Sequence, residues 1–286
     1  MKVILAGAFG KLGTDILKTL VREGHDVLAV DMAVRDIEGI EGKYEKKIVD
    51  VTKPDQVRGI CDGREALITT VGLTRGGVNV TNYDIDYQGN LNLLQEAKRA
   101  GVRYFDYVSV LKADDPRAKN IPMLDAKAML EKELKKSGLQ YVIYRPTGYF
   151  YDIVKVFKPM IEKGKVTLLG KDQVSCNVID TTDLADFIVE HMCDENKTYN
   201  IGGTETYTYE EIAKMMFAVN GKEPNISRAP VWLFDVLAWV QKVRKTGKEG
   251  LIRFSKWTLS ESMVADVHYG KLSFKKYIEE NGKTGA

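Results

Sequence analysis

The first fourteen residues, MKVILAGAFGKLGT, constrain the fold more than any other stretch of this chain. Residues 2–6 are a short apolar run, Gly7, Gly10 and Gly13 follow at three-residue spacing, and apolar residues then recur at helix spacing over 12–20. A strand, a tight glycine turn and a helix in this order leave backbone N–H groups at a helix N-terminus, where a pyrophosphate is favoured. A Cβ in that turn would block the phosphates or the packing of helix on strand. The segment predicts a dinucleotide site, and a purely structural turn is the alternative.

Apolar runs alternate with amphipathic helices through about residue 150. The pattern predicts strands at 26–30, 47–49, 66–70, 104–108 and 141–144, and helices after Pro54, over 79–100 and over 124–137. This β-α alternation is typical of an α/β fold with a doubly wound parallel sheet, that is, a Rossmann domain. We expect this dinucleotide-binding domain over residues 1–150, completed by segments near 177–201.

The pattern loosens after residue 150. It predicts helices at 152–162, 180–192, 208–219, 231–243, 249–263 and 272–280, and short strands at 166–169, 177–179 and 199–203. We expect residues 151–286 to form a smaller, mostly helical substrate lobe that is discontinuous in sequence. Ligands of open α/β sheets bind outside the carboxyl ends of the strands, so candidate site residues are sought there.

Composition excludes several classes of protein. Hydrophobic residues make up 44% and charged residues 29%, the net charge is +2, and no basic block stands out, so a nucleic-acid partner is not expected. Cys61, Cys176 and Cys193 lie far apart without metal-ligand spacing, which favours small buried side chains in a reducing compartment and no metal site. No apolar run reaches membrane-spanning length and the chain starts in a core strand. The expectation is a cytoplasmic protein without membrane insertion.

An acidic residue lies where it can choose the cofactor. Asp31 ends the second predicted strand, eighteen residues after Gly13. A carboxylate there can accept both ribose hydroxyls of the adenosine half and repel a 2′-phosphate. A solvated turn residue is the alternative, and Arg35 nearby can instead hold a phosphate. The sequence favours NAD and leaves NADP possible.

Two further strand ends are candidate contacts. Asp50 closes the third strand, where it can bond the adenine amine with Val51 beside it, or simply cap the helix that begins after Pro54. The stretch 69–72 follows the fourth strand and is predicted to pass under the ribose and the nicotinamide.

Several motifs resemble the short-chain dehydrogenase/reductases in their extended or atypical branch. The turn 7–13 resembles its GxxGxxG turn, residues 86–90 its long-helix motif, and residues 145–147 its strand-end motif before the substrate lobe. The C-terminal half is most similar to the divinyl chlorophyllide reductase-like group, with matching motifs at 145–150, 183–185, 201–203 and 261–263. The resemblance covers the whole chain and implies NAD(P)-dependent reduction.

The resemblance also predicts catalytic positions, one of which departs from the family. Ser109 matches the catalytic Ser or Thr, and Lys127 matches the lysine of the YxxxK motif, but Met123 stands in place of the tyrosine. Methionine cannot donate a proton, which argues against routine ketone reduction or sugar epimerisation. Hydride addition to an activated C=C bond can use another donor or solvent. Tyr149 and Tyr151 are candidate donors, Tyr149 being the better placed, and core packing is their alternative.

The sequence thus predicts a reductase acting on an activated C=C or C=O bond of a small or flat apolar molecule, as a possible homodimer. A cofactor sensor without turnover and a scaffold subunit of a larger assembly are the alternatives. Trp232, Phe234 and Trp239 can line a substrate pocket, pack in the core or make a subunit contact. The predicted catalytic residues are Lys127, Ser109 and Tyr149. The predicted cofactor contacts are Gly7, Phe9, Gly10, Lys11, Leu12, Gly13, Asp31, Arg35, Asp50, Val51, Thr70, Val71, Gly72, Lys127, Pro146 and Thr147.

Overall fold

The computed structural model describes residues 1–73, 80–170 and 173–285. The chain divides into two compact units, each made of two segments. Unit 1 comprises Met1–Arg145 and Leu184–Tyr199, and unit 2 comprises Pro146–Asp183 and Asn200–Ala286.

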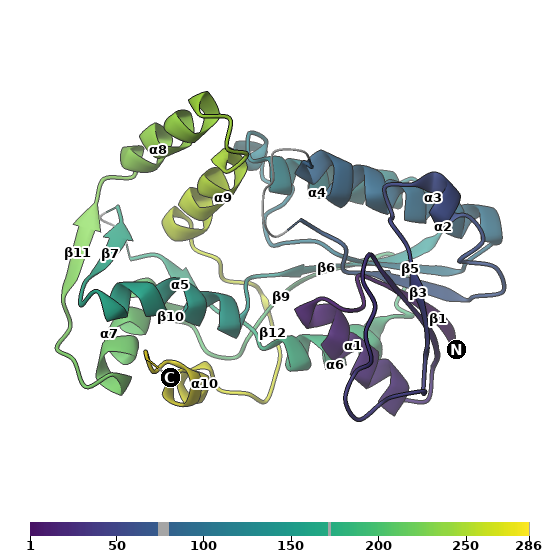
Figure 1. Ribbon diagram of the computed structural model, residues 1–286, viewed down its shortest axis with the longest axis horizontal. Helices are drawn as coiled ribbons and strands as arrows, with labels where there is room; N and C mark the ends of the chain where they lie inside the picture. Colours follow the sequence, from purple (N-terminus) through teal and green to yellow (C-terminus); the bar gives the residue numbers. More distant parts are fainter. Residues whose placement is uncertain (74–79, 171–172, 286) are drawn as a thin grey trace. The chain divides into compact units, whose positions relative to one another are not determined.

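The main sheet has eight strands in the order β12-β9-β6-β5-β4-β1-β2-β3 (Figure 1). Their bounds are β1 Lys2–Ala6, β2 Asp26–Asp31, β3 Glu45–Ile48, β4 Ala66–Thr69, β5 Tyr104–Val108, β6 Gln140–Pro146, β9 Lys197–Gly202 and β12 Val267–His268. Strand β1 pairs in parallel with both β2 and β4, with Ala6 opposite Val30 and Thr69. The order β3-β2-β1-β4-β5-β6 is that of a Rossmann fold, and the crevice outside the carboxyl ends of β1 and β4 is its ligand site. The predicted α/β fold class is confirmed.

Helices cover both faces of the sheet in unit 1. Figure 1 shows α2, α3 and α4 on one face and α1 and α6 on the other. Their bounds are α1 Lys11–Arg22, α2 Pro54–Val57, α3 Asn90–Ala100, α4 Pro122–Lys135 and α6 Thr181–His191, with a short 3-10 helix, η2, at Pro116–Ala118. The core on the α3 and α4 face includes the fully buried side chains of Ile4, Leu67, Leu93, Phe105 and Ile143. On α1, the side chains at positions 16, 17 and 20 are buried, as their helical spacing predicts.

Unit 2 is mostly helical. Its helices are α5 Phe150–Glu162, α7 Tyr209–Val219, α8 Trp232–Val243, α9 Glu249–Ser260 and α10 Phe274–Asn281. Two small sheets complete it: β7 Val166–Leu169 pairs in parallel with β11 Ile226–Ala229, and β8 Ser175–Cys176 pairs antiparallel with β10 Tyr207–Thr208. A capping box of Thr208 and Glu211 is present at the start of α7.

The helix predicted over 79–100 is not one regular helix. Residues 74–79, which include its predicted start, lie outside the described residues. The next segment is a π-helix, η1 Tyr83–Gly89, and only then does α3 begin. The side chain of Asn90 accounts for the wider turn, because its Nδ2 donates to the carbonyls of Ile85 and Asp86 at 3.3 and 3.0 Å and so occupies acceptors that a regular helix uses itself.

Other boundaries were also predicted wrongly. The helix after Pro54 is only one turn long, and β3 lies two residues earlier than expected. The strand expected at 177–179 is replaced by β8, which ends at Cys176. Asn177 explains the difference, because its side chain bonds the backbone of Gly203 and Ala265 instead of leaving the segment to a regular ladder. Strand β11 was not predicted at all.

Two further features are absent from the described residues. No helix is long and apolar enough to cross a membrane. No group of three His, Cys, Asp or Glu side chains is placed to hold a metal ion.

One buried carboxyl makes stability depend on pH. Asp106 in β5 is 1% exposed, and among the described residues neither of its carboxyl oxygens has a hydrogen-bond partner. Burial raises the pKa of Asp106 well above its ordinary value of 3.8. The folded state therefore binds this proton more tightly than the unfolded chain, so stability falls as pH rises from about 4 toward the raised pKa, by about 1.4 kcal/mol per pH unit.

We expect Asp106→Asn to flatten this dependence and to stabilise the fold at neutral pH relative to the native chain. Urea unfolding at a series of pH values measures the effect. Asp36→Asn, at an exposed position, is the control. If the free energy of unfolding changes with pH in the same way for Asp106→Asn and the native chain, the expectation is wrong.

Candidate nucleotide site

The glycine turn between β1 and α1 is built for close approach. Gly7 has φ +78°, and a Cβ on Gly13 would lie 2.0 Å from the carbonyl oxygen of Gly7, so both glycines are required by the turn itself. Gly10 differs, since the one described atom within 4 Å of an added Cβ is that same oxygen, at 3.4 Å. Among the described residues no side chain caps the start of α1. The first N–H groups of this helix therefore lie open to an anion.

Asp31 is held against this turn. The N–H of Phe9 donates to its Oδ2 at 3.0 Å, and the N–H of Met32 donates to its Oδ1 at 2.8 Å. Each oxygen keeps a further lone pair for a ribose hydroxyl. Arg35 shares the region, because its guanidinium lies 5.8 Å from the centre of the Phe9 ring and donates to Thr14 Oγ1 at 3.3 Å. A carboxylate and a guanidinium thus lie together beside the glycine turn.

The end of β4 is tied to the glycine turn. Thr70 Oγ1 donates to the carbonyl oxygen of Gly7 at 3.1 Å, and the N–H of Val71 donates to Thr69 Oγ1 at 3.2 Å. The carbonyl of Val71 accepts from Asn90. These bonds place the backbone that leads to Gly72 beside the turn, at the carboxyl edge of β1 and β4.

Lys127 on α4 is a buried cation at the same edge. It is 8% exposed, its Nζ lies 3.2 Å from Oδ1 of the fully buried Asp86, and it donates to the carbonyl of Val108 at the end of β5 at 3.3 Å. A Cβ on Gly72 would come within 2.8 Å of Asp86 Oδ1 and 3.4 Å of Lys127 Nζ. Glycine at position 72 therefore lets the chain pass close to this ion pair. The sequence analysis singled out Lys127 but not its partner.

Ser109 belongs to a second buried cluster. Its hydroxyl donates to Glu131 Oε1 at 2.6 Å, Arg145 binds the same carboxylate through two nitrogens, and Arg145 also pairs with Asp114 at 2.8 Å. Glu131 lies one helical turn after Lys127 on α4. The Ser109 proton is thus committed to a carboxylate, and Glu131 and Arg145 are site neighbours that spacing alone did not indicate.

The remaining predicted contacts of unit 1 have local partners. The carboxylate of Asp50 accepts from the N–H and hydroxyl of Thr52 at 3.0 and 2.7 Å, which is a local turn and not a helix cap, because the N-cap of α2 is Lys53. The carbonyl of Val51 accepts from Asn92 at 2.8 Å. Lys11 pairs with Asp15 and is well exposed, whereas Leu12 is buried.

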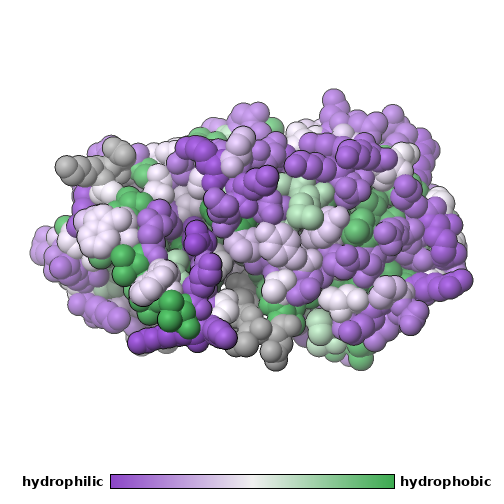
Figure 2. Space-filling view, turned by 90° about the horizontal axis from the view of Figure 1, so that it is seen from above, coloured by the Kyte–Doolittle hydropathy of each residue, from purple (hydrophilic) through white to green (hydrophobic). Residues whose placement is uncertain are grey.

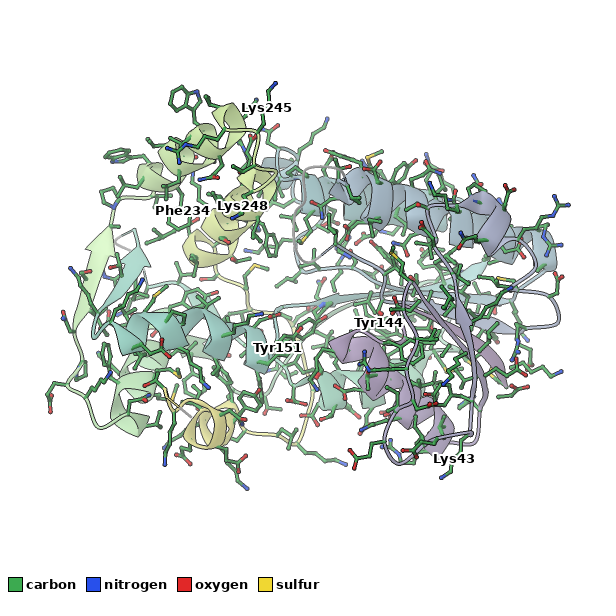
Figure 3. The ribbon with its side chains drawn as sticks, in the orientation of Figure 1. Lys43, Tyr144, Tyr151, Phe234, Lys245 and Lys248 are labelled. Carbon is green, nitrogen blue, oxygen red and sulfur yellow. The ribbon has the colours of Figure 1, made fainter. Side chains whose placement is uncertain are left out.

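Pro146, Thr147 and Tyr149 lie in unit 2. Pro146 ends β6, and Thr147 is bonded through its N–H to Ile201 and through its hydroxyl to Asn177. The ring of Tyr149 stacks on that of Tyr151, whose position Figure 3 shows, with centroids 5.7 Å apart. Burial raises the pKa of the Tyr149 hydroxyl above its ordinary value. This phenol keeps its proton throughout the neutral range.

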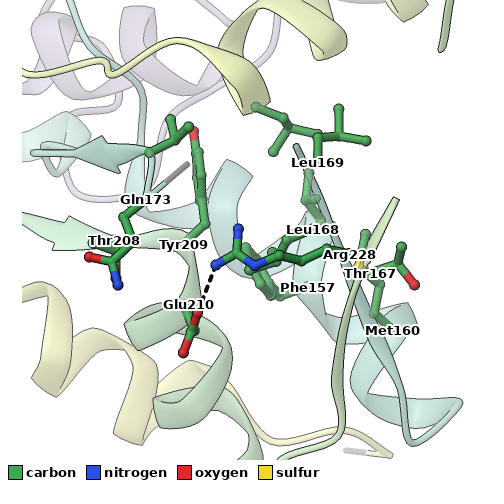
Figure 4. A pocket seen from close by; sticks show the side chains of 13 residues that line it. Phe157, Met160, Thr167, Leu168, Leu169, Gln173, Thr208, Tyr209, Glu210 and Arg228 are labelled. Atoms are coloured by element: carbon green, nitrogen blue, oxygen red, sulfur yellow. Dashed lines mark hydrogen bonds and ion pairs between the residues drawn. The ribbon is translucent and has the colours of Figure 1, made fainter. Parts of the chain in front are cut away.

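Unit 2 also contains a small apolar pocket (Figure 4). Phe157, Leu168 and Tyr209 are among its lining side chains, and Arg228 pairs with Glu210 beside them at 2.8 Å. The cavity volume is about 20 Å³, which is room for about one water molecule. As the side chains lie, this cavity has no room for a substrate.

The residues of unit 1 fit a dinucleotide. The open helix start and the space at Gly10 suit a pyrophosphate, and the oriented Asp31 carboxylate suits a ribose. Residues 7–195 match the family model described as NAD(P)H-binding. The chain belongs to this NAD(P)H-binding family. NAD or NADP is accordingly its cofactor.

The chain is also similar to two kinds of curated protein. It is 26% identical to the photosystem II assembly factor Ycf39 of Guillardia theta, over 82% of this chain and 74% of that protein. It is 27% identical to the chloroplastic divinyl chlorophyllide a 8-vinyl-reductase of Arabidopsis thaliana, over 84% of this chain and 62% of the reductase. The predicted resemblance to divinyl reductases is confirmed, and the assembly factors are a further similarity.

Solved structures share the fold at low identity. A nucleoside-diphosphate-sugar epimerase of Staphylococcus aureus matches with a TM-score of 0.75 and 17% identity, covering 98% of this chain and 96% of the epimerase. An NADPH-dependent quinone oxidoreductase of Escherichia coli, solved with NADPH, matches with a TM-score of 0.71 and 19% identity, covering 97% and 99%. These likenesses support the architecture described above.

The balance between Asp31 and Arg35 is testable by titration. We expect Asp31→Ala to weaken NAD by about 10- to 100-fold, because bonds to a charged group contribute about 1.5–3 kcal/mol, and to improve NADP relative to NAD. Calorimetry with both nucleotides measures the ratio. Asp36→Ala, in the same loop, is the matched control, since Asp36 forms an exposed ion pair with Lys46. If the native chain already prefers NADPH and Asp31→Ala leaves the ratio of the two affinities unchanged, then Arg35 and not Asp31 determines the choice of cofactor.

Proposed function

We propose that this chain is a reductase that transfers hydride from NAD(P)H to an activated C=C or C=O bond of a small or flat apolar substrate. The proposal rests on the position of Lys127, which is nearly buried and pairs with Asp86 at the carboxyl edge of β4 and β5. A cation there can bond the nicotinamide ribose and stabilise negative charge that develops on the substrate. The cofactor supplies the hydride when it is bound.

The proton must come from another group. Met123 offers none, and the Ser109 hydroxyl already donates to Glu131. Tyr149 is the donor we propose, since its phenol is protonated and follows β6 by three residues. Hydride addition to a conjugated substrate leaves negative charge spread over a delocalised system. Such a reaction depends less on immediate proton transfer than the reduction of a ketone does. The proposal therefore favours conjugated C=C bonds, in line with the name of the divinyl reductase relatives.

A second candidate function is a nucleotide-binding regulator or scaffold without turnover. The methionine at position 123 and the committed Ser109 hydroxyl favour it, as does the similarity to photosystem II assembly factors. The two candidates differ in one observable, which is steady oxidation of NADH or NADPH in the presence of a substrate.

Lys127→Ala is expected to lower both nucleotide affinity and turnover, the affinity by about 10-fold, because one charge-assisted bond is lost. The single variant also leaves the Asp86 carboxylate buried without its cation, which typically destabilises by about 3–5 kcal/mol. The matched variant Lys127→Ala with Asp86→Asn removes that charge and restores stability without restoring function. Calorimetry and cofactor oxidation measure the two effects. A double variant with native affinity and native turnover would refute the role of Lys127.

A further inference from the structure

Helix α8 of unit 2 presents an apolar face to solvent. Trp232, Val236, Trp239 and Val243 recur at intervals of four, three and four residues and so share one side of the helix. Their exposed fractions are 59%, 46%, 63% and 61%. Leu233 and Leu237 are also exposed and lie beside this stripe. The structure describes every residue of α8, and among them only Ala238 is buried. We call the four-residue stripe with these two leucines the α8 apolar face, defined as positions 232, 233, 236, 237, 239 and 243.

Basic side chains adjoin this face. Lys242, Arg244, Lys245 and Lys248 lie at the end of α8 and in the turn to α9, and all four are exposed (Figure 3, which labels Lys245 and Lys248). Within the described part of the chain, none of them forms an ion pair. The two acidic groups of the helix pair are each neutralised inside it, one by Lys256 and one by Arg253. Residues 231–260 thus carry six basic and two acidic residues, a charge of +4 in a chain whose net charge is +2.

We propose that the α8 apolar face, together with its basic turn, docks this protein on the surface of an anionic lipid bilayer. Tryptophan and aliphatic side chains beside lysine and arginine are the composition of a helix that lies in the membrane interface. The helix has 12 residues and is about 18 Å long, which suits lying along a membrane and is too short for crossing one.

The charge selects this occupant over a second copy of the chain. A two-fold contact through α8 would bring two +4 surfaces together, and like charges at an interface oppose association. Anionic headgroups instead complement the lysines while the indole and aliphatic groups enter the acyl boundary. Figure 2 looks onto this side of the molecule and shows hydrophobic and pale residues adjoining hydrophilic ones over unit 2.

Vesicle binding tests the proposal with the full chain. We expect flotation with vesicles of equal parts phosphatidylglycerol and phosphatidylcholine, little with pure phosphatidylcholine, and release by high salt. Tryptophan emission should shift to the blue on binding, because two of the three tryptophans are exposed in α8 and the third, Trp257, is already buried.

Variants separate the two parts of the surface. Lys242→Gln with Lys245→Gln should lower partitioning about 30-fold, since each basic residue contributes about 5-fold, and Trp232→Gln with Trp239→Gln should lower it at least about 10-fold. Lys98→Gln with Lys132→Gln removes the same charge from exposed positions of α3 and α4 and should leave partitioning within about 2-fold. An unchanged midpoint of thermal unfolding shows that each variant is folded.

Three results would overturn the proposal. The first is an absence of binding to the anionic vesicles, and the second is binding that the α8 variants do not weaken more than the control. The third is a native dimer in light scattering that Trp232→Gln with Trp239→Gln dissociates, which would assign the face to a second copy.

Discussion

Gly10→Val is expected to abolish NAD(P)H binding, with affinity reduced more than about 1,000-fold, while the fold survives. The backbone of Gly10 is extended, with φ −69° and ψ 172°, so a larger residue adopts it without strain. Its Cβ would meet one described protein atom within 4 Å, a carbonyl oxygen at 3.4 Å. The branched side chain instead occupies the space over the open N–H groups of α1, where the pyrophosphate must come. Calorimetry with NADH and NADPH measures the loss.

Two other glycine variants act as controls. Gly10→Ala should bind with an intermediate loss, because a single methyl group intrudes less. Gly13→Ala should unfold the chain at lower temperature, because its Cβ would lie 2.0 Å from the carbonyl oxygen of Gly7 whether or not a ligand is present. Unchanged affinity in a folded Gly10→Val would place the nucleotide elsewhere.

Tyr149→Phe is expected to reduce turnover by about 100- to 10,000-fold with nucleotide affinity nearly unchanged. Removing one general acid typically costs this much, and the phenyl ring keeps the stacking on Tyr151. The pKa of Tyr149 is raised above its ordinary value of 10, so the native rate should not fall through loss of this proton below about pH 10. Steady-state rates from pH 6 to 10 test both statements.

Tyr151→Phe is the matched control, since it removes a phenol two residues further along the same helix. We expect its turnover to stay within a few-fold of the native value. If Tyr149→Phe turns over at the native rate, the proton comes from solvent and the assignment of Tyr149 is wrong.

Local sequence patterns were enough to predict the fold of unit 1. Strand β5 occupies Tyr104–Val108 as expected, because its apolar run is short, bounded and buried. Errors arose where an asparagine side chain bonds the backbone. Asn90 widens η1 through the carbonyls of Ile85 and Asp86, five and four residues earlier. Asn177 replaces a ladder through Gly203 and Ala265, which the tertiary fold brings to it.

The candidate site was also predictable only in part. The glycine turn and the residues at strand ends follow from topology, which collects the carboxyl ends of β1, β4 and β5 at one edge. The buried ion pair of Lys127 with Asp86 does not, because the two residues are 41 positions apart and either could have faced solvent. The place of Asp86 at the start of the 86–90 motif was the one available signal.

The exposure of α8 was the least predictable feature. From the sequence, its tryptophans could belong to the core, a substrate pocket or a subunit contact. Apolar periodicity predicts an apolar helix face but not what packs against that face. The basic residues of the following turn are also unremarkable in a chain of nearly balanced charge. Their meaning depends on the pairing of Asp235 and Glu249 within the helix pair, which only the side-chain contacts reveal.

The central claim is that this chain transfers hydride from NAD(P)H, and deuterium transfer tests it most directly. NADH and NADPH deuterated at the reactive carbon are each incubated with the native chain and a panel of enones, quinones, aldehydes and divinyl porphyrins. With the native chain we expect cofactor oxidation with at least one substrate and deuterium on one carbon of the reduced product. With Gly10→Val we expect neither the oxidation nor the deuterium transfer. Tight nucleotide binding with no deuterium in any product would contradict it and leave the chain a nucleotide-binding regulator or scaffold.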